Sequence, residues 1–402
     1  MAFSFLKRHA LALAMLFQFG LGGAVMPFVT LYLLDRGLNI TGISQIFFGA
    51  SGMLLFFPFF WGMMADRYIP LNRLFTILNI LLILILGIFT RQFSFTGLMI
   101  SYMCFYACFN PSLLLLNPLS FHHLKNPRAD FGRLRLWGSI GWMIPSAIIF
   151  YFLATNPKLD LVYTVYLGMG IGVLMLGTSF FLPHTPSGTA HIVSDPETET
   201  GLTYFQAVRK LMTNKAYLIV LVVFFLVASS FSIQAIYSPL MLEQMGLERK
   251  WIGPAQCIGV VLEVFLFIWQ RRFLHRLSYA GTILVGAVAM LLRHFIFAFS
   301  DSLTLMIVSH LLTGLVIVFH HIGASVLVNA IAPKEVRSTA QTLLVLFGSG
   351  LGPMTANLSV GFISEATNQN LRMVFLFAAC LACLGTTILA LSAGRLNRAA
   401  RQ

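Results

Sequence analysis

The sequence predicts an all-α integral membrane protein of about twelve transmembrane helices, arranged as two six-helix bundles. Of its 402 residues, 58% are hydrophobic and only 10% are charged. In soluble domains about a quarter of all residues are charged. The apolar residues are gathered into long runs. One long polar segment divides these runs into two groups of six.

Each apolar run is long enough to cross about 30 Å of hydrocarbon as a helix. The first run follows the basic stretch Lys7-Arg8-His9 and so resembles a signal peptide. It continues for about 25 residues without an Ala-x-Ala cleavage site, which predicts an uncleaved first helix. The runs lie near 10–34, 42–64, 73–90, 96–117, 135–154, 162–182, 216–240, 252–270, 278–298, 303–329, 339–361 and 372–393.

The polar segment 183–215 is rich in Thr, Ser, Pro and acidic residues. This composition predicts a cytoplasmic linker, with a surface helix from Tyr204 to Leu211. The chain would then consist of an N-terminal bundle over 1–182, the linker, and a C-terminal bundle over 216–402.

The 26 Lys and Arg residues outnumber the 13 Asp and Glu residues, but they lie in short clusters between apolar runs. That distribution reports membrane topology and does not indicate a nucleic-acid partner. If the N-terminus is cytoplasmic, about nineteen basic residues fall on that side and six on the other. We therefore expect both termini to be cytoplasmic.

No phosphate loop, zinc-ligand spacing or nucleophile elbow is present in the sequence. The five cysteines lie in or beside apolar runs without His or acidic partners, where packing explains them. We therefore expect neither an enzyme nor a metal or other cofactor. A membrane enzyme or a non-transporting receptor would require a nucleophile, metal ligands or a large extramembrane domain.

Two charges lie well inside apolar runs, where a charge costs about 2.5–3.5 kcal/mol or more unless it faces a partner or water. Glu263 is near the middle of the eighth run, and Arg293 is inside the ninth. A carboxylate near an arginine can change protonation after a small geometric change, which is what proton coupling requires. The alternative is a static Glu263–Arg293 ion pair that holds two helices together.

A polar and aromatic stripe runs along the fifth helix. Arg135, Ser139, Trp142 and Ser146 follow one another at spacings that share one helical face. An arginine fork and a flat ring together suit a sugar or a nucleobase. Arg133 points to another side, which favours headgroup anchoring; Arg135 could also be a snorkelling interfacial residue.

Weaker polar stripes occur in both halves of the chain, which suggests a central polar cavity. Each residue in them is either an interhelical hydrogen-bonding group or a ligand contact. They comprise Ser230, Gln234, Tyr237 and Ser238 on the seventh helix, Asn110 and Asn117 on the fourth, and His310, Thr313 and His321 on the tenth.

The loop between runs two and three reads Trp61-Gly62-Met-Met-Ala-Asp66-Arg67-Tyr-Ile-Pro-Leu-Asn-Arg73. It resembles the GxxxDR signature of the major facilitator superfamily, and the resemblance covers essentially the whole chain. This implies the major-facilitator fold, in which two bundles rock about a central site. It also implies a conformational latch formed by Gly62, Asp66, Arg67 and Arg73.

The segment 131–142, together with the membrane charges, resembles one branch of that superfamily. The branch holds nucleoside:proton symporters, lactose-permease-like oligosaccharide:proton symporters and phenylpropionate-permease-like proteins. The resemblance implies substrate contacts from Arg135 and Trp142, and a substrate or proton role for Glu263. With the stripes, it predicts substrate binding at Arg135, Ser139, Trp142, Asn117, Gln234, Tyr237, Glu263 and His321, and proton coupling at Glu263, Arg293 and His321.

Nucleosides and sugars each find partial support in this resemblance. The nucleoside pattern matches at Asn110, Asn117 and Gln234 but has Asn where Tyr237 stands; the sugar pattern matches at Trp142 but has a carboxylate where Asn117 stands. We predict a monomer of the bacterial inner membrane that imports a nucleoside with a proton by alternating access, using the proton gradient and no cofactor. The alternatives are a sugar or aromatic-acid symporter, or an exporter of amphiphilic compounds.

Overall fold

A computed structural model of the chain describes residues 2–124, 127–187, 204–274, 277–333 and 336–401. Within these ranges all regular structure is helical, and eleven segments are long and apolar enough to cross a membrane. These segments coincide with eleven of the predicted runs. The remaining run, 252–270, coincides with a 23-residue helix, Ile252–Leu274, whose side chains are described as far as residue 266.

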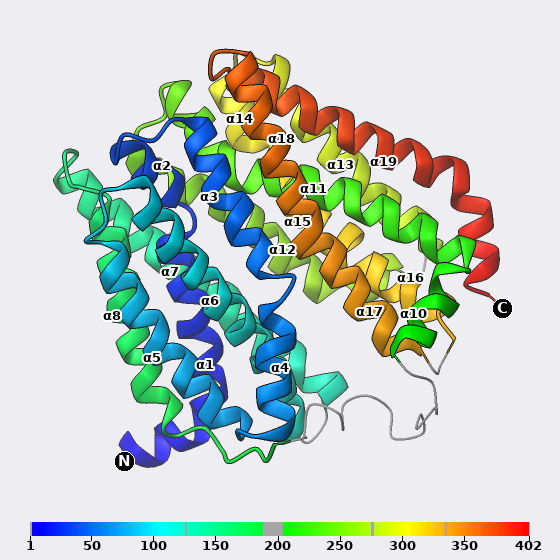
Figure 1. Ribbon diagram of the computed structural model, residues 1–402, viewed down its shortest axis with the longest axis horizontal. Coiled ribbons are helices and arrows are strands. Elements are labelled where there is room, and N and C mark those ends of the chain that lie inside the picture. The colour runs from blue at the N-terminus through cyan, green and yellow to red at the C-terminus, as the bar shows by residue number, and fades with distance from the viewer. Residues whose placement is uncertain (1, 125–126, 188–203, 275–276, 334–335, 402) are drawn as a thin grey trace. The chain divides into compact units, whose positions relative to one another are not determined.

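The chain forms two compact units. The first unit holds Met1–Pro196 and Glu248–Pro254, and the second holds Glu197–Leu247 and Ala255–Gln402. In the first unit, long helices pack side by side, with α1 against α7 and α8, and α5 against α6 (Figure 1). The helices are α1 (Ala2–Val25), α2 (Val29–Asp35), α3 (Ile40–Met53), α4 (Phe57–Arg67), α5 (Leu71–Phe89), α6 (Phe95–His123), α7 (Pro127–Thr155) and α8 (Val162–Ser179).

In the second unit, α13 packs against α19 and α11 packs against α19 and α18. The elements that follow α8 are α10 (Tyr204–Met212), α11 (Lys215–Gln244), η1 (Arg249–Trp251), α12 (Ile252–Leu274), α13 (Tyr279–Phe299), α14 (Leu303–Val308), α15 (Leu311–Leu315), η2 (Val316–Ile322), α16 (Gly323–Ile331), α17 (Arg337–Val345), η4 (Leu346–Leu351), α18 (Gly352–Ala366) and α19 (Leu371–Ala399).

Helix α5 shows how a sequence that is apolar on all sides still specifies which face packs inward. Leu74, Leu78 and Leu82 recur every four residues and are buried inside the unit, whereas Leu84 and Ile88 are largely exposed. A helix that is hydrophobic all round is expected in a bilayer, where acyl chains solvate its outer face. The exposed apolar face therefore identifies the side in contact with lipid.

Close contact between α1 and α7 depends on glycine. A Cβ atom on Gly141 would lie 2.0 Å from the carbonyl oxygen of Leu16, and one on Gly23 would lie 2.3 Å from that of Trp142. No side chain fits at these positions, so the two backbones touch directly. This packing places the polar stripe of α7 beside α1.

Two membrane segments of the second unit contain π-helical turns, η2 and η4. Glycines allow neighbouring elements to pack tightly against both. A Cβ on Gly286 of α13 would lie 2.6 Å from the backbone nitrogen of His320 in η2, and one on Gly348 of η4 would lie 2.1 Å from the ring of Phe224. π-helical turns are frequent at functional sites, so the side chains around η2 and η4 are candidates for such a site.

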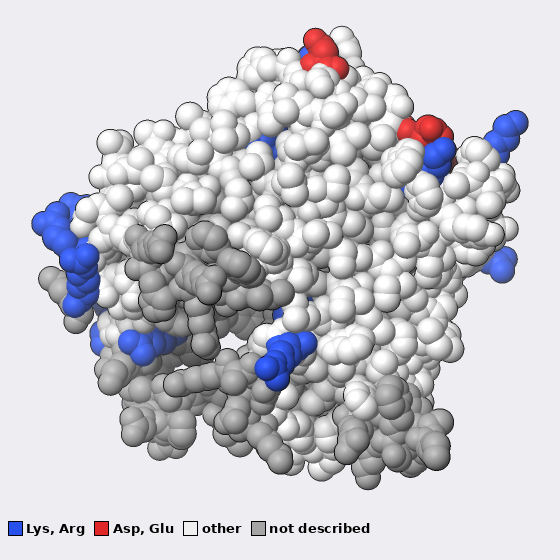
Figure 2. Space-filling model, turned by 180° about the vertical axis from the view of Figure 1, so that it is seen from behind, with Lys and Arg blue, Asp and Glu red and all other residues white. Residues whose placement is uncertain are grey.

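The predicted surface helix is present as α10, which packs against α11 and α17 with Leu211 buried. Residues 188–203 of the predicted linker lie outside the described residues. Figure 2 shows that Lys, Arg, Asp and Glu side chains are sparse among the described residues on the face it displays. Exposed apolar side chains such as Leu391, Phe180 and Phe362 fit a surface that faces lipid.

Candidate solute and proton sites

The predicted stripe on α7 lies against α1. The guanidinium of Arg135 stacks 4.1 Å from the ring centroid of Phe19, and Ser139, one turn along, is buried. An arginine stacked on an aromatic face keeps its planar donor fork in a fixed orientation. Arg133 is exposed, as its position on another side of the helix predicts. The guanidinium of Arg135 is thus held in a fixed orientation against α1.

Trp142 is half-buried between two helices. A Cβ on Gly22 of α1 would lie 2.9 Å from the Trp142 ring and 2.8 Å from the ring of Phe109 on α6. The indole therefore packs beside Phe109 without being fully enclosed. A partly exposed aromatic plane near Arg135 is suited to a flat or ring-shaped solute.

Polar residues of α6 take different places in the first unit. Asn117 is exposed, and Asn110 is half-buried with an amide nitrogen that has no hydrogen-bond partner among the described residues. Gln18 was not among the predicted site residues, but it is fully buried and donates to Ser112 Oγ at 2.5 Å. A Gln in the middle of the first apolar run was the available signal. This contact joins α1 to α6 next to the stripe.

The predicted latch lies where α4 ends and α5 begins. Arg67 and Arg73 are exposed, while Gly62 and Asp66 are partly buried. The indole of Trp61 donates to the carbonyl of Ala107 at 2.9 Å, which ties α4 to α6. The structure describes the latch residues within the first unit, and their role in a conformational change stays a prediction.

Thr185 anchors the chain after α8 at the same end of the first unit, a role that the sequence did not reveal. Its carbonyl accepts from the amide of Leu71 at 3.0 Å, and its hydroxyl lies 2.8 Å from His123 Nε2. The side chain of Asn72 accepts from its amide at 3.3 Å. Thr185 thereby joins the ends of α5 and α6.

The segment Glu248–Pro254 also belongs to the first unit. Arg249 forms a two-pronged ion pair with Asp35 at the end of α2, with both N–O distances 2.7 Å. Trp251 packs on Phe150 of α7, with ring centroids 4.8 Å apart. Bidentate geometry is the strong form of an arginine–carboxylate contact. This pairing links residues more than 200 positions apart, so no local pattern could predict it.

Glu263 and Arg293 are both buried in the second unit, with 6% and 3% of their surface exposed. The guanidinium of Arg293 donates through Nη1 to the hydroxyl of Thr313. A Cβ on Gly314, the next residue, would lie 2.7 Å from the backbone nitrogen of Glu263. The backbone of Glu263 and the guanidinium of Arg293 therefore both adjoin the Thr313–Gly314 step on the tenth segment.

Glycine again permits this convergence. A Cβ on Gly259 of α12 would lie 2.6 Å from the carbonyl oxygen of His310 and 2.9 Å from Thr313. Helix α12 therefore touches the α14–α15 region backbone to backbone. The position of Gly259, one turn before Glu263, was the sequence signal for this contact.

Histidines in the same unit lie among aromatic rings. His320 stacks on Phe224 with ring centroids 5.5 Å apart and planes 1° apart, and His321 meets Phe231 edge-on at 5.0 Å. Neither ring nitrogen of His320, nor Nδ1 of His321, has a hydrogen-bond partner among the described residues. Buried polar groups are ordinarily satisfied, so these nitrogens are places where water or a solute would bind favourably.

The two predicted residues of α11 differ. Gln234 is 1% exposed, and neither its amide oxygen nor its nitrogen has a partner among the described residues. Tyr237 is fully buried and donates to Asn357 Oδ1 on α18 at 2.8 Å. Gln234 is therefore available for a ligand, whereas the hydroxyl proton of Tyr237 is already engaged.

The described residues contain no group of three or more His, Cys, Asp or Glu side chains that could hold a metal ion. The first unit holds an arginine stacked on an aromatic ring, and the second unit holds buried ionisable groups. Arg135 and Arg293 lie in the candidate membrane spans Phe131–Thr155 and Tyr279–Phe299, and Glu263 lies in the 23-residue helix α12.

Such helices and membrane-embedded polar groups define a polytopic transport protein. The sequence profile of the MFS_1-like family matches residues 9–377, and the chain belongs to that family. It is 23% identical over 362 residues to an uncharacterized transporter, YwbF, of Bacillus subtilis, covering 89% of this chain and 88% of that one.

The nucleoside permease NupG of Escherichia coli is 21% identical over 348 residues, with 82% of this chain and 80% of the permease covered. A crystal structure of nucleoside transporter NupG superposes with a TM-score of 0.81 at 19% identity, covering 96% of this chain and 98% of that one. These relatives are transporters rather than enzymes. The predicted major-facilitator fold and the predicted class of protein are confirmed.

Proposed function

We propose that this transporter imports a nucleoside together with a proton by alternating access. The observation that carries the proposal is the burial of Glu263 and Arg293 around the Thr313–Gly314 step, inside the membrane-spanning part of the second unit. Charges at that depth are costly and are typical of ion and proton pathways. Protonation of Glu263 would remove one of these charges and so favour a different arrangement of the helices.

Two side chains of the first unit favour a nucleoside as the solute. Arg135, held on Phe19, offers a planar donor fork, and Trp142 offers a half-buried ring. A nucleoside carries both a flat base and a hydroxyl-bearing ribose, which these two groups match. The name of the nucleoside permease among the relatives supports the same substrate. A sugar is the second candidate, because stacking on Trp142 suits a pyranose ring equally well.

The topology belongs to the same proposal. Both termini would lie in the cytoplasm of a bacterium, with the protein in the inner membrane, because the basic residues cluster at one set of loops. Transport would use the proton gradient and no cofactor. The transporter would be a monomer. Gln234 and His321 would contribute solute contacts from the second unit through their unsatisfied polar atoms.

The test is uptake of labelled uridine, adenosine and lactose into cells or proteoliposomes under an imposed pH gradient. We expect a nucleoside to accumulate when the outside is acidic and to stop accumulating when an uncoupler removes the gradient. Accumulation of lactose without nucleoside uptake would select the sugar alternative. Nucleoside uptake that ignores the pH gradient would contradict proton coupling.

A further inference from the structure

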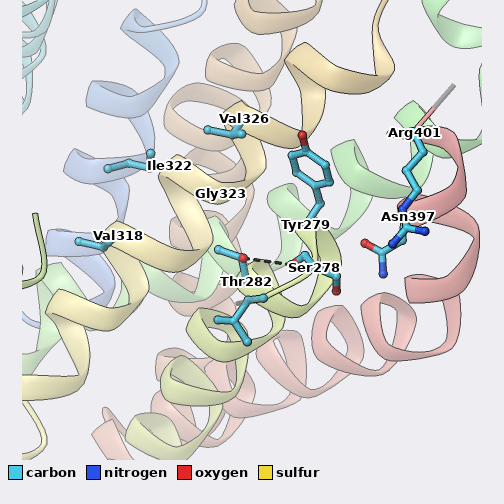
Figure 3. A pocket seen from close by; sticks show the side chains of 10 residues that line it. Ser278, Tyr279, Thr282, Val318, Ile322, Gly323, Val326, Asn397 and Arg401 are labelled. Atoms are coloured by element: carbon cyan, nitrogen blue, oxygen red, sulfur yellow. Dashed lines mark hydrogen bonds between the residues drawn. The ribbon is translucent and has the colours of Figure 1, made fainter. Parts of the chain in front are cut away.

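A cavity of about 410 Å³ opens in the second unit and is lined by the start of α13, by η2 and α16, and by residues at and just beyond the end of α19. One wall is apolar and comes from Val318, Ile322 and Val326, which lie four residues apart on η2 and α16. Tyr279 lies at the start of α13, Asn397 lies near the end of α19, and Arg401 lies two residues beyond that end. Figure 3 shows the three aliphatic side chains on one side of the view, Tyr279 in the middle, and Asn397 with Arg401 on the other side.

The cavity runs from headgroup depth into the hydrocarbon region. Tyr279 begins one candidate membrane span, and Arg401 lies two residues beyond the end of another, Leu371–Ala399. Val318 and Val326 lie inside the span Leu303–Ile331, eight residues apart, which corresponds to about 12 Å along a helix. Val326 is 45% exposed, so the apolar wall is accessible from outside the unit.

The polar end of the cavity is basic. No Asp or Glu is among its described lining residues, and no described carboxylate forms an ion pair with Arg401. The first-turn amides of α13 are already capped, because Gly281 donates to Ser278 Oγ at 3.1 Å and Ala280 donates to Asn397 Oδ1 at 3.0 Å. An anion would therefore be bound by Arg401 and by the hydroxyl of Tyr279.

Two further arginines lie on the last turns of α19, shortly before Arg401. Arg395 and Arg398 are exposed and are not part of the cavity lining. In Figure 2, basic side chains gather at the edge where α19 ends. A cluster of arginines at a helix end attracts negatively charged lipid to that end, but Arg401 is the arginine that lines the cavity among the described residues.

We propose that this cavity is a binding site for an anionic phospholipid, with its phosphate on Arg401 and Tyr279 and one acyl chain along Val318, Ile322 and Val326. A bound molecule must combine a negative head with an apolar tail of membrane depth, and both features belong to a phospholipid of the surrounding bilayer. None of the residues proposed to bind solute or proton is among the described lining residues of the cavity, so the proposal does not depend on the identity of the transported solute.

The experiment is native mass spectrometry of the full chain in detergent, titrated with phosphatidylglycerol or with phosphatidylcholine of the same acyl chains. We expect the first phosphatidylglycerol to bind at least fivefold more tightly than phosphatidylcholine. Arg401→Gln should weaken it about fivefold, which corresponds to the loss of one basic contact. Val326→Trp, at an exposed position, should abolish tight binding by filling the apolar wall.

The matched control is Arg395→Gln, which removes the same charge from the same helix but away from the cavity. It should change phosphatidylglycerol affinity less than twofold. Equal loss in Arg395→Gln and Arg401→Gln would mean general surface attraction and would overturn the proposal. So would equal affinity for the two lipids, or displacement of phosphatidylglycerol by inorganic phosphate. Thermal unfolding in detergent confirms that each variant is folded.

Discussion

The two units present different chemistry at membrane depth. On α7 of the first unit, Arg135 stacks on Phe19 and is accompanied by Ser139 and the half-buried Trp142. Around the Thr313–Gly314 step of the second unit, Glu263 and Arg293 are buried and histidines lie nearby among aromatic rings. The first set has a permanent charge and ring surfaces, while the second contains groups that can gain or lose a proton.

This difference suggests that the first unit orients the solute and that the second responds to pH. A permanent charge held on an aromatic ring can orient a solute at any physiological pH, because arginine does not lose its proton there. A buried carboxylate loses its charge when it gains a proton. Protonation therefore removes the free-energy cost of keeping that charge away from water. We therefore expect changes in the first unit to alter solute affinity, and changes in the second to alter the response to pH.

The largest expected effect is on solute recognition by Arg135. Arg135→Lys keeps the charge but loses the planar fork and its stacking on Phe19, so we expect kcat/KM for uptake to fall about 10- to 100-fold. Proton dependence of the remaining uptake should be unchanged. Arg133→Lys, on an exposed side of the same helix, is the control and should behave as the unchanged protein. Equal losses in both variants would contradict the special role of Arg135.

The next effect concerns the packing that places the α7 stripe. Gly141→Ala would put a methyl group 2.0 Å from the Leu16 carbonyl oxygen, and we expect the free energy of unfolding to fall by about 1–3 kcal/mol. Thermal unfolding in detergent measures this loss. Gly170→Ala is the matched control, since nothing lies within 4 Å of its added Cβ. A Gly141→Ala protein as stable as Gly170→Ala would show that α1 and α7 do not touch there.

The smallest effect is expected at Tyr237. Tyr237→Phe removes the hydrogen bond to Asn357 Oδ1, and we expect a loss of about 1 kcal/mol in the free energy of unfolding. Because that hydroxyl donates within the second unit, KM for solute should change less than twofold. A tenfold rise in KM without a change in stability would instead make Tyr237 a direct solute contact, as the sequence pattern suggested.

Much of the fold followed from the sequence because the bilayer imposes a simple rule on each helix. A run such as 73–90 must be helical to satisfy its backbone, and it appears as Leu71–Phe89. The helical periodicity of the fifth run also predicted that Arg135 and Ser139 share a face and that Arg133 does not. The burial of Glu263 agrees with the expectation that membrane carboxylates avoid lipid.

Contacts between helices were harder to predict, because they depend on which faces meet in space. The sequence singled out Tyr237 as a polar residue but could not show that Asn357 would engage its hydroxyl. It likewise gave no pairing for Gln18 with Ser112, or for Asp35 with Arg249. The glycines that bring these elements together are visible in the sequence, but their partners are defined only by tertiary packing.

The division between the two units is tested most directly by Glu263→Gln, which keeps the size of the side chain and removes its ability to ionise. Uptake of labelled nucleoside into proteoliposomes is measured in two ways: accumulation driven by a pH gradient, and exchange against unlabelled nucleoside with no gradient. We predict that Glu263→Gln exchanges at a rate within about threefold of the original while gradient-driven accumulation falls at least tenfold. Full pH-driven accumulation by this variant would contradict the account.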